Sequence, residues 1–201
     1  MAENAYTYAQ TINFEVYLDT ATTADSGGSS GKKGATSGNS SKYLGIASVD
    51  LPEITFQAQD ISGVGIGGTI NYPSLWLTDS MATTLHWRSL TQDISEFSRQ
   101  RAVTLQLYSA VNSYKNSDGS LEPMAIKIKM RVLPKKGTLG KLQPNELMDN
   151  ETEFEVIRLE VYVNGNEEYL IDKVNYVLKL GGQEDMFANV KHILENGVQQ
   201  A

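Results

Sequence analysis

Apolar and polar positions alternate along most of this chain with a repeat of two residues. Successive side chains of a β-strand point to opposite faces, so this alternation predicts strands with one face in a core. The cleanest run is 126–132, where isoleucine, methionine and valine alternate with lysine and arginine. The chain is therefore predicted to be mainly β. The apolar positions of the other predicted strands are Ile12, Phe14, Val16 and Leu18; Met81, Thr83, Leu85 and Trp87; Val103, Leu105 and Leu107; and Ile157, Leu159, Val161 and Val163.

Near the C-terminus the repeat changes to that of a helix. Acidic residues at 184 and 185 and a glycine at 197 mark its expected start and stop. We expect this amphipathic helix to pack its apolar stripe across the sheet. A polar segment, 89–101, is predicted to be a short helix or a turn. The apolar stripe of the C-terminal helix consists of Met186, Phe187, Val190, Ile193 and Leu194.

Residues 20–42 interrupt the pattern because they contain no Val, Ile, Leu, Met or aromatic residue. Such a segment has nothing to bury against the entropy of ordering it, so it is predicted to be a flexible Gly/Ser-rich loop. It lies between two strand-like runs, which indicates a long insertion in a hairpin connection.

Length and charge narrow the possible functions. The chain has 201 residues, a formal net charge of -7 and no cysteine, which predicts one domain without disulfides or thiolate metal sites. An acidic balance argues against a static nucleic-acid binder. No segment approaches the roughly 18 apolar residues of a membrane span, and the N-terminus lacks a signal-peptide pattern. We therefore expect a cytosolic protein without stable membrane association.

One glycine-rich segment matches the letters of a dinucleotide-binding motif. Gly63, Gly65 and Gly68 fit G-x-G-x-x-G, but the following residues are β-rich and lead to Pro73 instead of a helix. The cofactor interpretation therefore fails. Glycines in and beside strands more often mark bulges, tight bends or close backbone contacts between chains.

The sequence contains no recognisable catalytic or metal-binding constellation. His86 and His192 lie on different predicted elements, and neither has a second ligand at metal spacing. A serine nucleophile would need a histidine base and an oxyanion hole, and no G-x-S-x-G elbow occurs. We therefore predict no enzyme activity, no cofactor and no metal.

One strand carries a basic row, formed by Lys127, Lys129 and Arg131 and followed by lysines at 135 and 136. This row could contact phosphate or pair with the acidic surface of a neighbouring subunit. In a chain of net charge -7 we favour the second interpretation.

Four blocks of sequence together resemble the major tail tube proteins of contractile phages. They read LPEI at 51–54, ISGVGIGGTI at 61–70, DSMATTLHWR at 79–88 and YLIDKVNYVLKLGGQED at 169–185. The likeness runs from about Phe14 to Leu194. It selects as family-motif and assembly candidates Pro52, Gly63, Gly65, Gly68, Trp87, Arg88, Asp172, Lys173, Asn175 and Gly181.

The resemblance implies a structural protein with a single tail tube domain, 1–201, and a β-sandwich or barrel-like fold flanked by a C-terminal helix. Such proteins form hexameric rings that stack into a hollow inner tube, inside a sheath and on a baseplate, for DNA passage or membrane puncture. They occur in virion tails, bacteriocins and injection systems, assembled in the bacterial host cytoplasm. Segment 20–42 departs from the family by its length, so its contacts stay open.

A different function class stays open as an alternative. A β-sandwich binding module on a virion or cell surface would need an exposed aromatic platform, for which Trp76, Trp87 and ten tyrosines supply material. Such a module would stay a monomer or small oligomer, whereas a tube protein would form rings. If DNA passes through the tube, we expect the lumen to carry acidic or neutral groups.

Overall fold

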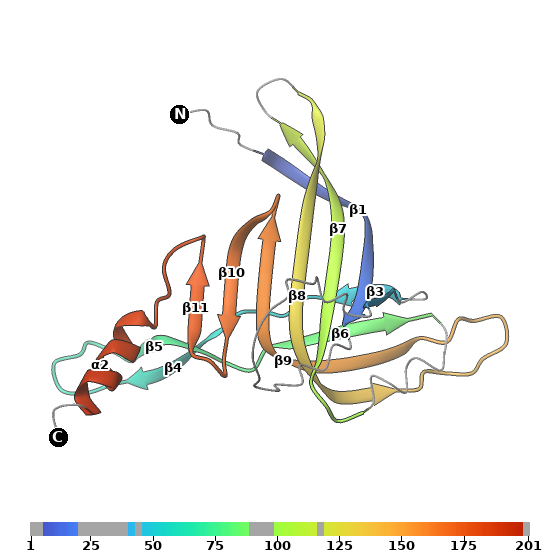
Figure 1. Ribbon diagram of the computed structural model, residues 1–201. Coiled ribbons are helices and arrows are strands. Elements are labelled where there is room, and N and C mark those ends of the chain that lie inside the picture. The colour runs from blue at the N-terminus through green and yellow to red at the C-terminus, as the bar shows by residue number, and fades with distance from the viewer. Residues whose placement is uncertain (1–5, 20–39, 43–45, 89–98, 116–118, 199–201) are drawn as a thin grey trace, which may run out of the picture.

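The computed structural model describes residues 6–19, 40–42, 46–88, 99–115 and 119–198 (Figure 1). Most of the predicted loop 20–42 and of the predicted helix or turn 89–101 lies outside these residues. The described chain is mainly β, as predicted. Its elements are β1 (Tyr6–Asp19), β2 (Ser40–Lys42), β3 (Ile46–Asp50), β4 (Phe56–Ile61), β5 (Ile70–Thr78), β6 (Ala82–Trp87), β7 (Val103–Lys115), β8 (Leu121–Thr138), β9 (Asn150–Val163), β10 (Asn166–Asp172), β11 (Val177–Leu180) and α2 (Ala188–Val198).

Nine strands form one antiparallel sheet that folds into two layers. The first layer has the order β11-β10-β9-β8-β7-β1-β2, and β3 and β6 join through β9. The long strands β8 and β9 belong to both layers, because they bend and sweep sideways after leaving the first (Figure 1). Two register shifts lie at this bend, after Arg131 and after Pro134. Bulges of this kind let one strand turn a corner between sheets.

The core lies between the layers and uses the predicted alternation. Trp87, Leu105, Met130 and Phe154 are almost completely buried, with no more than 1% of their surface exposed. The predicted inward positions of β6 and β7 and Ile128 and Val132 of β8 are buried as well. The two-residue repeat was therefore sufficient to assign the core face of these strands.

Two predicted core positions are wrong, and both coincide with irregular pairing. Ile12 is 59% exposed because β1 shifts register between Thr11 and Asn13. In β9, Phe154 and Val156 are buried with a spacing of two residues, but the next buried apolar residue is Leu159, three positions further on. Ile157 is the extra residue of the bulge opposite β8, so the repeat shifts by one position there.

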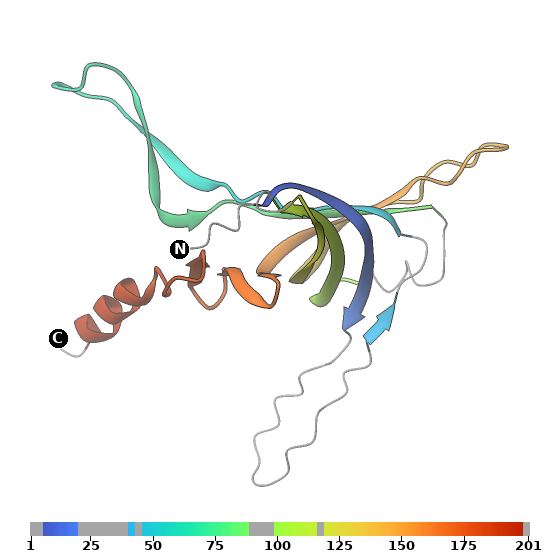
Figure 2. The same ribbon diagram turned by 90° about the horizontal axis from the view of Figure 1, so that it is seen from above.

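Helix α2 begins later and packs less than predicted. Phe187, just before it, is buried, and Met186 and Val190 pack against the core. Ile193 and Leu194 are 68% and 63% exposed, because the helix extends away from the sheet (Figure 2). The predicted glycine stop is also wrong, since α2 continues through residue 197 to Val198.

Two hairpins project beyond the layers at opposite ends of the molecule (Figure 2). We call residues 53–79, which contain the separate two-stranded sheet β4–β5, the arm. We call residues 133–149, where β8 leads into β9, the tip. Neither projection contributes to the core cluster beyond the base of the arm.

Candidate functional site

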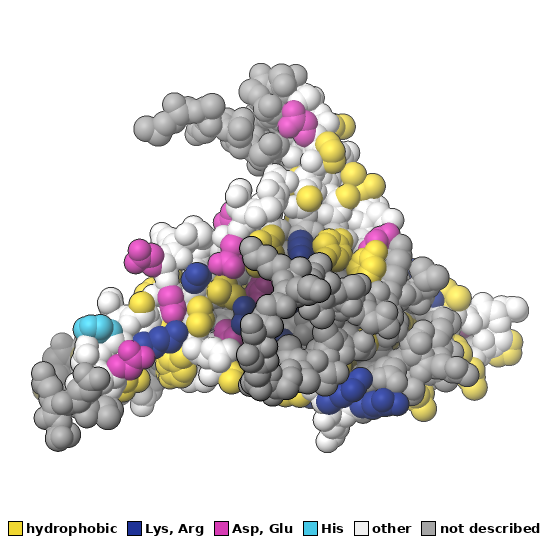
Figure 3. Space-filling model, in the orientation of Figure 1, with side chains coloured by type: hydrophobic (Ala, Val, Ile, Leu, Met, Phe, Trp, Pro, Cys, Tyr) yellow, Lys and Arg dark blue, Asp and Glu magenta, His cyan; other side chains and the backbone are white. Residues whose placement is uncertain are grey.

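The first layer turns a charged face away from the core, which we call the polar face. Register places the outward positions of β1 and β7–β11 side by side across it, and Figure 3 shows basic and acidic side chains interspersed there. Among the side chains that the structure describes on this face, five basic ones face four acidic ones, so the acidic surplus of the chain lies elsewhere. These described charged residues are Glu15, Lys127, Lys129, Arg131, Arg158, Glu160, Glu167, Asp172 and Lys179.

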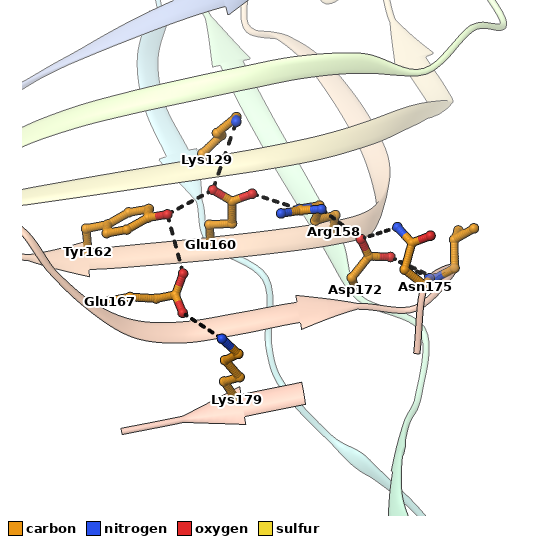
Figure 4. A network of polar contacts seen from close by, with 9 residues as sticks. Lys129, Arg158, Glu160, Tyr162, Glu167, Asp172, Asn175 and Lys179 are labelled. Atoms are coloured by element: carbon orange, nitrogen blue, oxygen red, sulfur yellow. Dashed lines mark hydrogen bonds and ion pairs between the residues drawn. The ribbon is translucent and has the colours of Figure 1, made fainter. Parts of the chain in front are cut away.

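Glu160 is the centre of a network on this face (Figure 4). Its side chain is only 8% exposed, and its oxygens lie 2.7 Å from Arg158 Nε and 4.0 Å from Lys129 Nζ. The Tyr162 hydroxyl donates to Glu160 at 3.1 Å and also lies 3.5 Å from Glu167, whose other oxygen is 3.9 Å from Lys179 Nζ. Two neighbours on the same strand, Arg158 and Tyr162, and the cross-strand Lys129 thus compensate a buried carboxylate.

The network disfavours ionisation of Tyr162. Burial raises the pKa of its hydroxyl, and the carboxylates of Glu160 and Glu167 raise that pKa further. The hydroxyl therefore remains a donor at neutral pH and serves one carboxylate at a time.

The turn between β10 and β11 continues this network through Asp172. Arg158 Nη1 donates to its Oδ2 at 3.0 Å, and the backbone N–H groups of Val174 and Asn175 donate to its Oδ1 at 3.1 and 2.8 Å. The Asn175 amide adds a bond of 2.7 Å. Burial alone would raise the pKa of Asp172, but these donors outweigh it and hold the pKa below its ordinary value. Asp172 and Asn175 therefore fix the turn.

Lys173 connects this turn to the second layer. Its Nζ donates to the carbonyl of Asp79 at 2.7 Å and lies 3.4 Å from Glu155 on β9. Glu155 also accepts bonds from Ser80 Oγ and the Met81 N–H. Burial opposes ionisation of Glu155, yet these donors lower its pKa overall. The family-motif run Asp172, Lys173 and Asn175 is thus a structural junction.

At one end of the polar face the strands surround an open hollow of about 570 Å³. The Lys127 ammonium lies over the rings of Tyr108 and Tyr162, 5.4 and 6.0 Å from their centroids. Tyr17 packs edge-on against Tyr108 with ring centroids 5.5 Å apart. The tyrosines therefore hold a lysine of the same chain by cation–π contact.

The other candidates do not gather at one site. Trp87 is in the core, where its Nε1 donates to Thr152 Oγ1 at 3.2 Å, and Arg88 is exposed just after β6. Half-buried Pro52 precedes β4. Gly181 adopts a left-handed φ of 65° in the turn after β11. The candidates Gly63, Gly65 and Gly68 lie in the turn at the end of the arm.

Two residues of the basic row pair within their own chain, and the predicted pairing of the row with a neighbouring subunit stays a prediction. Lys129 is beside Glu160 because β9 brings that residue opposite it, and Lys135 is 3.0 Å from Glu153. Sequence reasoning also missed Arg158, Glu160 and Tyr162. These residues occupy the polar positions of a predicted strand, and the alternating charges at these positions were the signal that could have predicted a polar network.

The described residues include no cluster of three His, Cys, Asp or Glu side chains suited to a metal. His86 lies between two exposed carboxylates, with Nε2 2.9 Å from Asp50 and Nδ1 3.6 Å from Glu151. None of the described helices has the length and apolar character needed to cross a membrane. What the site offers is a self-compensated surface on a rigid sheet.

Comparison with known proteins gives the chain a family. Residues 35–194 match the family model described as phage tail tube protein FII. The match begins within segment 20–42, later than the predicted likeness from Phe14, and ends at Leu194 as predicted. A search of the curated proteins found no match.

Three solved structures are similar over most of their length. One is the sheath/tube terminator of the PVC extracellular contractile injection system in the extended state. It is 12% identical in sequence, the match covers 75% of this chain and 94% of that chain, and the TM-score is 0.45. Another is the sheath-tube complex of the same system, with 12% identity, coverage of 74% and 87%, and a TM-score of 0.44. The third is the anti-feeding prophage baseplate, with 11% identity, coverage of 81% and 97%, and a TM-score of 0.44.

The family match spans most of the sequence, and the mainly β fold with a C-terminal helix agrees with it. The chain therefore belongs to the phage tail tube protein FII family and is a structural protein of a tail or a phage-tail-like particle.

Proposed function

We propose that this protein forms hexameric rings that stack into the hollow inner tube of a contractile tail. The observation that carries this proposal is the family match over residues 35–194. The tube would be enclosed by a sheath and rest on a baseplate; the similar structures come from a sheath-tube complex and a baseplate. Assembly would take place in the bacterial host cytoplasm.

The first layer has the features that a ring needs. Among the described strands, β11 ends one side of it, and β1 is covered by β2 only at 17–19 on the other. On the β11 side, Leu178 donates its N–H to Asp185 Oδ1 and accepts from the Met186 N–H, so the segment after β11 already occupies most of that edge. A contact between this side of one copy and the open part of β1 in the next would be heterologous and could close into a ring. It would cover the exposed edge of β1.

In such a ring we assign the polar face to the lumen. Because basic and acidic groups nearly balance on this wall, it would neither hold phosphate strongly nor repel it. DNA passage or passage of another polymer would then meet little electrostatic retention. The proposal also gives the buried pairs a role, because they keep the wall rigid without outside partners.

Negative-stain electron microscopy of the pure protein at high concentration tests the proposal. Six-fold rings or hollow rods are the expected result. A protein that stays monomeric at every concentration would contradict it and would favour the alternative, a β-sandwich binding module on a virion or cell surface. A ring map with the polar face on the outside would reject the lumen assignment alone.

A further inference from the structure

The arm and the tip are apolar surfaces at opposite ends of the subunit (Figure 2). All six residues of β4 are exposed, and β4 and β5 pair only with each other among the described strands. An isolated two-stranded hairpin has marginal stability in water and leaves open edges. The exposed large apolar side chains are Phe56, Ile61, Val64, Ile70, Tyr72 and Leu77 on the arm and Leu133, Leu139, Leu142 and Leu147 on the tip.

The arm is acidic, whereas the tip carries lysines that form no ion pair with a described residue. The arm, 53–79, contains three acidic residues and no lysine or arginine. The tip, 133–149, contains three lysines and two acidic residues, and one of these lysines, Lys135, pairs with Glu153 outside the tip. The carboxylates that return along β9 are engaged nearby, Glu151 by His86 and Glu153 by Lys135. Exposed Lys136 and Lys141 have no ion pair with any described residue. These two lysines can pair with the carboxylates of the arm, whereas contact between two acidic arms would be repulsive.

Each projection lies beside a different edge of the first layer. The arm is on the side of β11 and the tip is on the side of β1 (Figure 1). A head-to-tail contact that brings these two edges together would therefore also bring the arm of one copy toward the tip of the next.

The glycines at the end of the arm fit a close approach to another chain. A Cβ added at Gly63, Gly67 or Gly68 would meet no atom within 4 Å, and only Gly65 of this turn has a left-handed φ, 94°. The fold of one chain therefore does not require three of the four glycines. A backbone without side chains can approach a partner surface closely.

We propose that the acidic, apolar arm of one copy docks on the leucine- and lysine-bearing tip of the next copy. This inference rests on the proposed ring and adds a second contact to it, in the second layer. The partner that covers the arm is thus a second copy of this chain.

A mixing experiment tests the docking. The arm variant carries Ile61→Ser, Ile70→Ser and Tyr72→Ser, which register places on one face. The tip variant carries Leu139→Ser, Leu142→Ser and Leu147→Ser. Alone, each variant should lose at least tenfold in ring yield, because every arm–tip contact in its ring is defective. Mixed at equal amounts, the two should form dimers by light scattering, since one intact arm meets one intact tip. Leu121→Ser, on an exposed residue at the start of β8, is the control and should keep wild-type yield.

A charge exchange provides the second measurement. Glu53→Lys with Asp60→Lys should reduce assembly, as should Lys136→Glu with Lys141→Glu, and all four together should restore it. Rings formed by either serine variant alone would overturn the docking. The docking would also be overturned if neither the mixture of the two serine variants nor the charge exchange recovered assembly. Both results would leave the ring proposal standing. A wild-type protein that never assembles would count against both proposals.

Discussion

The polar face and the arm differ in whether their side chains find partners within the same chain. On the polar face, Glu160 and Asp172 are almost fully buried, and every charge that they bring is met by Arg158, a lysine, a tyrosine or a backbone donor. On the arm, apolar residues such as Tyr72 face solvent. One region completes its interactions within a single chain, and the other does not.

This difference separates two requirements of a tube protein. The self-compensated region should determine the stability of the isolated subunit, because removing a partner there leaves a buried charge alone. The exposed region should contribute little to that stability, because its apolar surface remains in water until another copy covers it. Stability and assembly should therefore respond to different substitutions.

The largest effect is expected in the core that supports the polar face. Trp87→Ala should lower the free energy of unfolding by about 3–5 kcal/mol, because it leaves a cavity and removes the donor to Thr152. Tyr72→Ala on the arm, where the ring is 60% exposed, should change it by no more than about 0.5 kcal/mol. Urea denaturation of the dilute protein gives both values.

A Trp87→Ala protein that fails to fold would still be informative beside Trp87→Phe, for which we expect a loss of about 1–3 kcal/mol. If Tyr72→Ala destabilised the monomer as much as Trp87→Phe, the arm would have to pack within the chain, and the comparison would fail.

The second effect concerns the buried pairs. Arg158→Ala leaves Glu160 and Asp172 without their shared cation, but the arginine side chain is itself 41% exposed, so water can replace part of it. We expect a loss of about 2 kcal/mol, less than for a fully buried pair. Lys141→Ala, an exposed lysine of the tip, should stay within about 0.5 kcal/mol of wild type. Equal losses for the two variants would show that the network does not stabilise the fold.

Much of the fold followed from the sequence because strand alternation reports burial directly. The core positions of β6 and β7 were correct, since these strands pair regularly. The errors at Ile12 and Ile157 arose at bulges, where pairing geometry and not composition sets the face. Ile193 and Leu194 were misplaced for a related reason, because a helical repeat identifies an apolar stripe but not the surface that covers it.

The polar network was harder to predict than the core. Lys129 and Glu160 are 31 positions apart in the sequence, and only the register of β8 on β9 brings them together. The family resemblance selected Asp172, Lys173 and Asn175 as assembly candidates but did not predict the contacts that they make within the chain. Their contacts with Arg158 on β9, Asp79 and Glu155 depend on how the two layers meet.

Acid should weaken the polar face in a defined direction. The pKa of Asp172 is lower in the folded chain than its ordinary value, so its contribution is complete above the ordinary carboxyl pKa and is lost as pH falls through the folded pKa. Asp172→Asn should therefore cost about 1–2 kcal/mol at pH 7 and flatten the loss of stability between about pH 5 and pH 2. Denaturation curves across this range measure the slope. Asp60→Asn on the arm is the matched control, and an equal flattening by both variants would contradict the assignment.

The smallest effect on the subunit is expected at the glycines of the arm, where the contrast between the two regions is sharpest. Gly63→Ala and Gly68→Ala place a Cβ in open space, so the unfolding free energy of the monomer should change by no more than about 0.5 kcal/mol. The same variants should reduce ring yield if the arm's backbone closely approaches a neighbouring copy. Gly140→Ala reverses the pattern, because its Cβ would clash with Asn150 and its φ of 74° disfavours alanine, so this variant should destabilise the monomer first. Thermal melting and electron microscopy on the same samples separate the two outcomes, and unchanged ring yield in both arm variants would mean that these glycines do not make the contact.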